Sequence, residues 1–408
     1  MIRQKEYSLS NKLIITNYHN RLISAIFNEK DLVQVNFEEE EESRLLGNIY
    51  IGKVQNIVKN INAAFVEIAP GIMGYLSLED TKNPIFTKWN NNSPKVKIGD
   101  ELVVQVTRDA VKTKAPVVTS NINIAGKYTV LVHGKTNIGI SGKISNEEKR
   151  NELKRVLLPY KSDEFGFIIR TNAEYASNEE IVKEAEALTK IYNNIRQYGV
   201  HRTRFTLLHQ NPPSYICDIR DNLSDCMSEI ITDDQVVYDM IQMYLEAFQP
   251  EDLPKLRFYD DPMISVSNLY SITSKIENAL KQHVWLKSGG SIVIQPTEAL
   301  TVIDVNTEKA IAGRKNAQDT FFKVNMEAAH EIAKQIRLRN LSGIIVIDFI
   351  DLNEREKKEL LMKELSGLFR KDPVKTILVD MTALGLVEVT RKKIKRPLHE
   401  QVQKIQLP

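Results

Sequence analysis

Cysteine is scarce in this chain, and long apolar runs are missing. Cys217 and Cys226 are the only two cysteines, and no CxxC pair or histidine cluster accompanies them. This pattern argues against a disulfide framework and against a cysteine-based zinc site. No apolar run approaches the roughly 18 residues of a membrane helix, and the N-terminus lacks the apolar core of a signal peptide. We therefore expect a cytoplasmic protein with reduced thiols and no membrane segment.

A strong charge bias is also missing. The 408 residues include 55 Lys and Arg against 53 Asp and Glu, a formal net charge of +2. Overall charge therefore indicates no polyanionic partner, and any such site must be local. The length suggests roughly two to four structural units, with apolar residues enough for real cores.

Strand-like segments dominate the first 120 residues. Residues 1–36 alternate apolar and polar side chains, which predicts two or three antiparallel strands. The acidic run Glu38–Glu42 breaks this pattern and marks a boundary. From residue 46 to about residue 120, segments such as GNIYIGKVQNIV, AAFVEIA and ELVVQVTRD recur between glycines and prolines. They indicate a small barrel.

The middle of the chain mixes helices and strands. Residues 121–212 predict an α+β unit, with a polar helix near 145–156 and a capping box, Ser177 to Glu180, that opens another helix. Residues 213–282 predict a strand at SYICDIRD and helices near 233–248 and 273–284.

Apolar runs return in the last third. GGSIVIQP, ALTVIDVN and GIIVIDFID predict core strands, and EKKELLMKELSGLFRK and KTILVDM predict a helix and a strand. FFKVNMEAAHEIAKQIRLRN predicts a helix. Its apolar stripe, which we expect to pack on the sheet, consists of Phe322, Met326, Ala329, Ala333 and Ile336.

Two of these core strands end in carboxylates, Asp304 and Asp348. One strand-to-helix-to-strand passage separates them, so a right-handed crossover would place both acids at one edge of the sheet. Two carboxylates suit Mg²⁺ or Mn²⁺, and Asn306 could orient one of them or donate to a phosphate. The acids could instead cap the turns that follow, and the pattern alone leaves both interpretations open.

Three segments resemble the ribonuclease E/G family of bacterial endoribonucleases: SGGSIVIQPTEALTVIDVNT, NMEAAHEIAKQIRLRNLSGIIVIDFIDL and TALGLVEVTRKK. The resemblance extends in order over nearly the whole chain and implies an α/β and α+β multidomain fold. Its expected parts are an RNase H-like subdomain (1–44 and 213–282), an inserted S1-type OB barrel (45–120), a 5′-monophosphate sensor (121–212), a DNase I-like catalytic subdomain (283–400) and a C-terminal tail (401–408).

The resemblance assigns a catalytic Mg²⁺ to Asp304 and Asp348, with Asn306 positioning the site. It also implies that Phe65 and Tyr75 stack on RNA bases and that Lys114 supplies a basic contact. OB-type barrels bind single strands in this way, by exposed aromatic rings beside basic groups. Taken alone, Phe65 would more often be a core residue.

A 5′-phosphate pocket is implied in the middle unit. A guanidinium and a hydroxyl hold a terminal phosphate well, and Arg170 and Thr171 supply them in tandem. By resemblance, Gly126 and Val130 complete this pocket. The arginine–threonine pair alone would more often lie on the surface. The basic run RKKIKR, residues 391–396, could contact phosphates or could simply be a solvated helix end.

One departure from the family concerns zinc. Family members usually carry a CPxC motif after the basic run, which joins two subunits through a shared zinc, and PLHEQVQKIQLP contains no cysteine. We therefore expect no zinc site and no zinc-linked dimer in this chain, while another kind of homodimer stays open. Gln295 and Pro296, where the family often has an aspartate-led turn, are a lesser departure.

The expected activity is Mg²⁺-dependent cleavage of single-stranded, A/U-rich RNA in RNA processing and decay, with a preference for 5′-monophosphate ends. Such cleavage leaves 5′-phosphate and 3′-hydroxyl ends. One alternative is an RNA-binding protein of the same fold that cleaves little because the zinc link is missing. Another is a DNA nuclease or phosphodiesterase with the same metal geometry, which the barrel and the resemblance disfavour.

Overall fold

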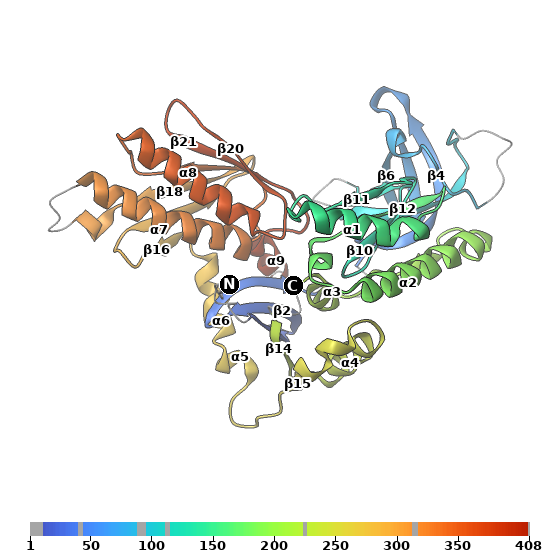
Figure 1. Ribbon diagram of the computed structural model, residues 1–408, viewed down its shortest axis with the longest axis horizontal. Coiled ribbons are helices and arrows are strands. Elements are labelled where there is room, and N and C mark those ends of the chain that lie inside the picture. The colour runs from blue at the N-terminus through green and yellow to red at the C-terminus, as the bar shows by residue number, and fades with distance from the viewer. Residues whose placement is uncertain are drawn as a thin grey trace. The chain divides into compact units, whose positions relative to one another are not determined.

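The computed structural model describes residues 11–39, 44–87, 95–110, 115–222, 227–311 and 317–406 (Figure 1). The chain forms two compact units. One consists of Met1–Glu38 and Ser224–Pro408, and the other of Glu39–Leu223. The first division therefore falls at the start of the acidic run. No helix in the described residues combines the length and apolar character needed to cross a membrane.

The first unit contains a five-stranded sheet built around the N-terminal strands. Its order is β15-β14-β1-β2-β3. Strands β1 to β3 are antiparallel neighbours, which confirms the prediction from alternating residues, and β14 and β15 add parallel strands beside β1. The bounds are β1 (Asn11–Tyr18), β2 (Arg21–Asn28), β3 (Asp31–Phe37), β14 (Met227–Thr232) and β15 (Leu256–Phe258).

Helices surround this sheet. They are α4 (Gln235–Phe248), α5 (Val266–Leu269), α6 (Ile272–Leu280) and the C-terminal α9 (Leu398–Gln406). Asp234 caps α4 by accepting a hydrogen bond from the backbone of Val237. Leu398 and Val402 of α9 are buried in the same core as Phe37 of β3.

A second sheet in this unit carries the two strand-end aspartates. Its order is β16-β17-β18-β19-β21-β20, and only β18 and β19 run parallel. The bounds are β16 (His283–Trp285), β17 (Ser291–Pro296), β18 (Leu300–Asn306), β19 (Gly343–Asp348), β20 (Thr376–Met381) and β21 (Leu386–Arg391).

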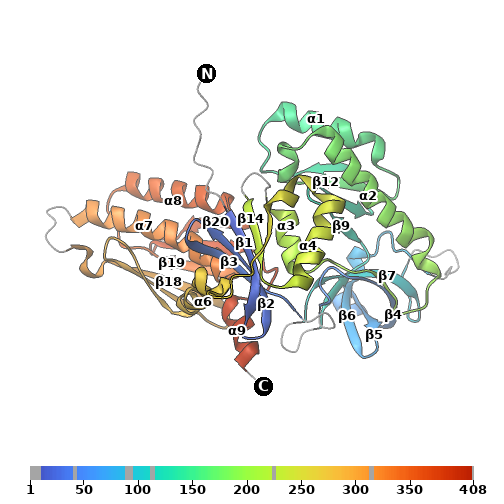
Figure 2. The same ribbon diagram turned by 90° about the horizontal axis from the view of Figure 1, so that it is seen from below.

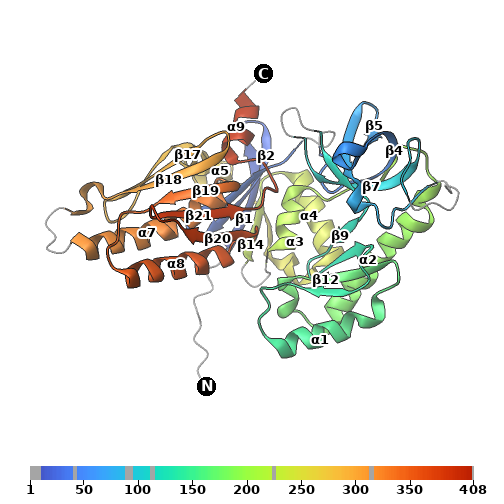
Figure 3. The same cartoon turned by 90° about the horizontal axis from the view of Figure 1, so that it is seen from above.

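Two helices cover one face of the second sheet, α7 (Ala317–Leu338) and α8 (Arg355–Arg370) (Figures 1 and 3). Ile303 and Ile347 point from the strands into the core that these helices close. The predicted stripe of α7 is confirmed, because Ala329 and Ile336 are buried there and the other members are partly buried against the same core. Since strand side chains alternate, the residues beside these isoleucines face away from the helices.

Two sequence predictions were wrong, and one strand was not predicted. SYICDIRD forms a helix, α3 (Ser214–Asp221), because Tyr215, Ile216 and Ile219 bury one helical face. The helix expected at 273–284 ends at Leu280, and its last residues begin the edge strand β16. Strand β21 was not expected, yet it lies between β19 and β20. Local pattern was overridden by packing in each case.

The second unit contains a closed five-stranded barrel, consistent with an OB-like fold. The strands pair in the ring β4-β5-β6-β8-β7, and β7 pairs with β4 to close it. A short strand, β13 (Leu207–His209), adds to β4. The bounds are β4 (Ile49–Val58), β5 (Ala63–Ala69), β6 (Ile72–Ser77), β7 (Glu101–Arg108) and β8 (Val117–Thr119).

A four-stranded sheet completes the second unit, in the order β11-β12-β10-β9. Helices α1 (Glu147–Leu157) and α2 (Asn178–Gln197) lie together beside it (Figure 2). The predicted capping box of Ser177 and Glu180 is present at the start of α2. The strands are β9 (Asn123–Ala125), β10 (Thr129–His133), β11 (Ile138–Ile140) and β12 (Phe165–Ile169).

Candidate functional site

Asp304 and Asp348 occupy matching positions on the two parallel strands. Asp304 of β18 is the direct register partner of Asp348, the last residue of β19. The prediction that the two acids lie side by side at one sheet edge is therefore confirmed. Both face away from α7 and α8, because their neighbours Ile303 and Ile347 point into the core. Asp304 is half-buried and Asp348 is exposed.

The electrostatics of this pair favour a bound cation. Partial burial, and then the negative charges of Asp304 and Asp351, raise the pKa of the Asp348 carboxyl. The amide of Asn306 donates a hydrogen bond of 2.7 Å to Oδ2 of Asp304. Asn306 thus orients one carboxylate, as its place on the same strand face predicts. A cation between the two acids would relieve their mutual repulsion.

A buried asparagine, which the sequence patterns did not reveal, supports the segment after β19. Asn325 of α7 is fully buried. Its Nδ2 donates to the carbonyl of Ile350 (2.7 Å), and its Oδ1 accepts from the Ile350 N–H (3.1 Å). Ile350 is two residues beyond Asp348, so Asn325 fixes the position of the backbone that follows Asp348. A polar residue inside the apolar stripe of α7 was the available signal.

The donor set fits a hydrated Mg²⁺ or Mn²⁺. Across the described residues, no three His, Cys, Asp or Glu side chains are grouped so as to hold a metal. Mg²⁺ does not require such a cage, since it keeps several waters and commonly uses one or two carboxylates plus substrate phosphate oxygens. Two opposed carboxylates, with one oriented by an amide, match that requirement.

Arg170, directly after β12, lies beside one of the other predicted sensor residues. Its Nη1 donates to the carbonyl of Gly126 (2.6 Å) and to Oδ1 of Asp221 (2.7 Å). Within the described part of the chain, its Nε and Nη2 have no protein partner, and the side chain is 26% exposed. That edge of the guanidinium therefore presents two parallel donors, the geometry that holds a phosphate.

The two other predicted sensor residues are near Arg170: Val130 lies on β10 of the same four-stranded sheet, and Thr171 follows Arg170 after the end of β12. The hydroxyl of Thr171 is 3.0 Å from that of Ser141. Val130 of β10 is half-buried and pairs across the sheet with Ile168, the second residue before Arg170. The structure thus gathers Arg170, Thr171 and Gly126 around the end of β12, with Val130 on the neighbouring strand.

A glycine is required at position 126 because the side chain of Glu184 lies directly against its backbone. A Cβ at this position would lie 2.3 Å from the carboxyl carbon of Glu184 on α2. That carboxylate accepts hydrogen bonds from three successive backbone N–H groups, those of Lys127 (2.6 Å), Tyr128 (2.9 Å) and Thr129 (2.7 Å). Gly126 therefore admits the acid that fixes the turn between β9 and β10.

Arg220 and Asp221, which sequence reasoning missed, complete the surroundings of Arg170. Arg220 grips the Asp221 carboxylate through Nε (2.8 Å) and Nη2 (3.3 Å), while its Nη1 donates to the carbonyl of Ala125 (3.2 Å). Burial acts to raise the pKa of Asp221, but the Arg220 and Arg170 guanidiniums outweigh it and leave that pKa below its usual value. Arg220 and Asp221 are the last two residues of α3. Because this segment had been predicted as a strand, nothing in the sequence indicated that they lie near Arg170.

The two predicted stacking residues lie opposite each other on the barrel. Phe65 of β5 and Tyr75 of β6 are register partners, with ring centroids 6.2 Å apart and planes at 80°. Both are half-buried and lie outside the barrel core, which Ala64, Val66 and Leu76 fill. The alternative that Phe65 is a core residue is therefore wrong. Lys114 lies outside the described residues.

The basic run 391–396, whose first residue is also the last residue of β21, is partly structural. Arg391 is 4% exposed, and its Nε donates to Oδ2 of Asp372 (2.8 Å). Its Nη1 donates to the side chain of Asn340 (2.8 Å) and the carbonyl of Leu341 (3.0 Å). Arg391 therefore ties the end of β21 to the segments before β19 and β20, and its contacts within the described residues occupy the guanidinium, whereas residues 392 and 393 are exposed.

Comparison with known proteins identifies the family of this chain. The family model described as "Ribonuclease E/G family" matches residues 123–394. The chain is 33% identical to ribonuclease G of Salmonella typhimurium over 373 residues, 89% of this chain and 76% of that protein. It is also 33% identical to ribonuclease G of Escherichia coli over 378 residues (90% and 76%) and 31% identical to ribonuclease E of a Nostoc species over 394 residues (95% and 56%). The chain therefore belongs to the ribonuclease E/G family.

Proposed function

We propose that this protein is a Mg²⁺-dependent endoribonuclease that cuts single-stranded RNA and leaves 5′-phosphate and 3′-hydroxyl ends. The observation that carries the proposal is the register pairing of Asp304 with Asp348 in a chain of this family. A pair of carboxylates at one sheet edge provides the ligands for a hydrated divalent ion next to an RNA phosphate.

The residues around the pair keep it in place. Asp304 and Asp348 would hold the ion, which when bound activates water and stabilises charge on the scissile phosphate. Asn306 fixes Oδ2 of Asp304, and Asn325 fixes the backbone beyond Asp348. Such preorganisation matters because small displacements of a reacting group cost large factors in rate.

The barrel would bind the strand, with Phe65 and Tyr75 stacking on successive bases and Lys114 contacting a phosphate. Their half-exposed rings on neighbouring strands support this role. Stacking tolerates any base, so the A/U preference in this proposal reflects how readily such segments stay single-stranded.

The small sheet would read the RNA 5′ end. We assign the 5′-phosphate to the two free donors of Arg170 and to the hydroxyl of Thr171, with Gly126 and Val130 shaping the pocket. Asp221, held by Arg220, occupies only the Nη1 side of Arg170, which orients the opposite edge for the phosphate. A 5′-hydroxyl end offers no such charge and would bind more weakly.

A cleavage assay tests the proposal. A short A/U-rich RNA with either a 5′-monophosphate or a 5′-hydroxyl is incubated with the protein and Mg²⁺, or with EDTA, and the product ends are identified. We expect Mg²⁺-dependent cleavage, faster for the monophosphate, with new 5′-phosphate ends. Tight RNA binding without cleavage, even at high protein concentration, would instead show an RNA-binding protein of the same fold.

A further inference from the structure

An exposed tryptophan lies on β16, the outermost strand of the sheet that carries the aspartates. Trp285 of β16 is 64% exposed. The ring of His283, two residues earlier and on the same strand face, lies 4.5 Å from it, centroid to centroid. Val284, between them, packs on the core shared with α7. Two rings thus lie together on the face of β16 that points away from that core.

The strand register connects this ring pair to the candidate active site. His283 pairs with Val293, Val293 pairs with Asp304, and Asp304 pairs with Asp348. In the next row, Trp285 pairs with Ser291, and Ser291 pairs with Asn306. Register partners point to the same face of a sheet. The rings therefore share a face with the aspartates, two strand spacings or about 10 Å from Asp304.

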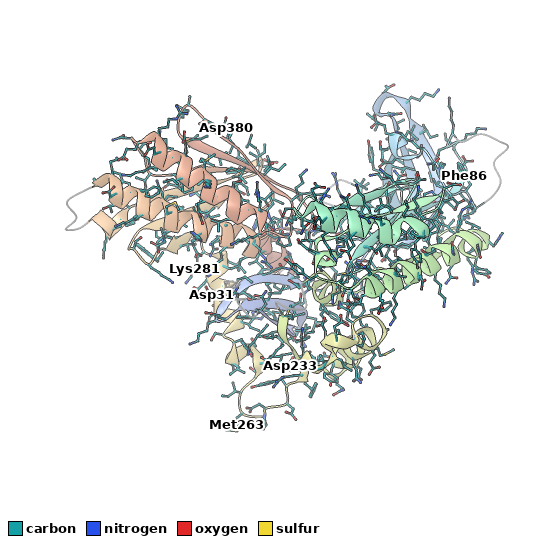
Figure 4. The ribbon with its side chains drawn as sticks, viewed as in Figure 1. Asp31, Phe86, Asp233, Met263, Lys281 and Asp380 are labelled. Carbon is teal, nitrogen blue, oxygen red and sulfur yellow. The ribbon has the colours of Figure 1, made fainter. Side chains whose placement is uncertain are left out.

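A basic hollow lies along the edge strand β16, beside the ring pair, and extends around that strand to α7 on the other face of the sheet. Its volume is about 920 Å³, and its lining includes Trp285, His283, Lys275, Lys281, Lys334 and Asp31. Figure 4 shows Asp31 and Lys281 close together on this side of the first unit. Three lysines against one acid give the lining a positive balance.

The lysines differ in how much of their charge is compensated. Lys334 forms an ion pair of 2.8 Å with Asp31. Lys281 donates to the neutral side chain of Asn278 (2.8 Å), and Lys275 donates to the carbonyl of Tyr270 (3.0 Å). Among the described residues, these two lysines therefore have neutral hydrogen-bond partners, which suits a polyanion. His283 has one acid nearby, since its Nε2 lies 4.0 Å from Glu308.

We propose that His283 and Trp285 form a stacking platform for a base of the RNA strand next to the cleavage site, and that Lys281 and Lys275 attract the phosphates that follow. The chemistry is that of single-strand binding, in which a base stacks on an aromatic ring beside a basic groove. This proposal rests on the proposed function, because it places the platform beside the bond to be cut. It adds a second contact surface, on the catalytic sheet, to the one proposed on the barrel.

Fluorescence of Trp285 tests the platform without requiring cleavage. The sequence contains two tryptophans, so Trp89→Phe leaves Trp285 as the single reporter. The full chain with Trp89→Phe and Asp304→Asn is titrated with a single-stranded A/U-rich RNA and with an abasic oligomer of the same length. We expect saturable quenching by the RNA and little quenching by the abasic oligomer.

Substitutions separate stacking from charge. Trp285→Ala should weaken RNA binding by roughly 5- to 150-fold, whereas Trp285→Phe should retain most of the affinity. Lys281→Ala should lower the slope of log affinity against log salt by about 1. Phe248→Ala, which removes an exposed ring of the same unit outside the hollow, is the matched control and should leave binding unchanged.

Three results would overturn the platform. RNA binding with no change in Trp285 fluorescence would remove it and leave the proposed nuclease untouched. A fluorescence shift that follows protein concentration without RNA would show that a second copy of the chain covers Trp285. Failure to bind RNA at all would overturn the proposed function as well. Failure of the platform alone is therefore distinguishable from failure of the proposed function.

Discussion

Asp304 and Asp348 lie directly opposite each other on adjacent parallel strands, and both face the side of the sheet that α7 and α8 leave open. Partial burial and the neighbouring charges of Asp304 and Asp351 raise the pKa of Asp348. Two like charges in this position have a cost unless a cation compensates them. The proposed divalent-ion site rests on this arrangement, and the following predictions depend on it and on its surroundings.

Asn325→Ala should destabilise the first unit by about 1–3 kcal/mol, because it leaves the N–H and C=O groups of the half-buried Ile350 without their side-chain partner. It should also slow cleavage while RNA affinity stays constant. Chemical denaturation and single-turnover cleavage measure the two effects. Gln318→Ala, which removes one exposed acceptor for the Asn353 N–H, is the control and should cost far less. Equal, small losses for both variants would show that Asn325 does not support the site.

Arg170→Ala should abolish the rate advantage of 5′-monophosphate over 5′-hydroxyl RNA. Asp221→Asn should reduce that advantage in part, mainly through KM, because the guanidinium loses its charged partner but remains present. Rates on the two substrates measure the ratio. Glu164→Gln breaks an exposed ion pair with Arg196 in the same unit and should leave the ratio unchanged. An increased ratio for Asp221→Asn would mean that Asp221 competes with the phosphate for Arg170.

Phe65→Ala and Tyr75→Ala should each weaken RNA binding by about 1–3 kcal/mol, the range for one lost base stack. Tyr75→Phe should bind like the unaltered protein, since stacking needs the ring and not the hydroxyl. Because the two rings contact each other, the double variant should lose less than the two single losses added together. Fluorescence anisotropy with labelled RNA measures all four variants, and full affinity without either ring would contradict the stacking role.

His133 should make the second unit sensitive to mild acid. Burial lowers its pKa below the usual value, with Nδ1 2.9 Å from the Tyr192 hydroxyl and Nε2 2.6 Å from the Asn83 carbonyl. Between the folded pKa and the unfolded value of about 6.5, the unfolded chain binds more protons. Stability should therefore fall as pH drops below about 6.5, by up to about 1.4 kcal/mol per pH unit.

The control for this pH effect is His133→Gln, which removes the titrating group. Denaturant unfolding of both proteins at several pH values between 5 and 8 gives the comparison. The variant should be less stable at pH 8 but should lose less additional stability on acidification. Parallel pH profiles for the two proteins would exclude His133 as the source.

The aspartate pair could be predicted from sequence because two features agreed. Apolar runs end at Asp304 and Asp348, and the strand-helix-strand passage between them predicts adjacent parallel strands with both carboxyl ends together. The exact register, Asp304 opposite Asp348, came from the structure. The barrel strands and the capping box of α2 were equally local signals. In each of these cases the residues that make the pattern are also the residues that make the contact.

The rest of the site depends on contacts between distant segments. Arg220 and Asp221 reach Arg170 only because SYICDIRD packs as a helix, and eight residues with both periodicities cannot decide that. In the sequence, Asn325 is a polar residue in an apolar stripe, and its role appears only when the fold brings the Ile350 backbone to its side chain. The helix predicted for residues 273–284 stops one residue before Trp285, and only the register of β16 places Trp285 in line with Asn306.

The most direct test of the central claim is cleavage of a 5′-monophosphorylated A/U-rich RNA by Asp304→Asn and Asp348→Asn, with RNA affinity measured separately. Each substitution removes one charged ligand but preserves shape. We predict that both variants bind RNA like the unaltered protein and lose cleavage by at least about 100-fold at any Mg²⁺ concentration. Unchanged cleavage and Mg²⁺ dependence in either variant would contradict the assignment of this pair as the metal site.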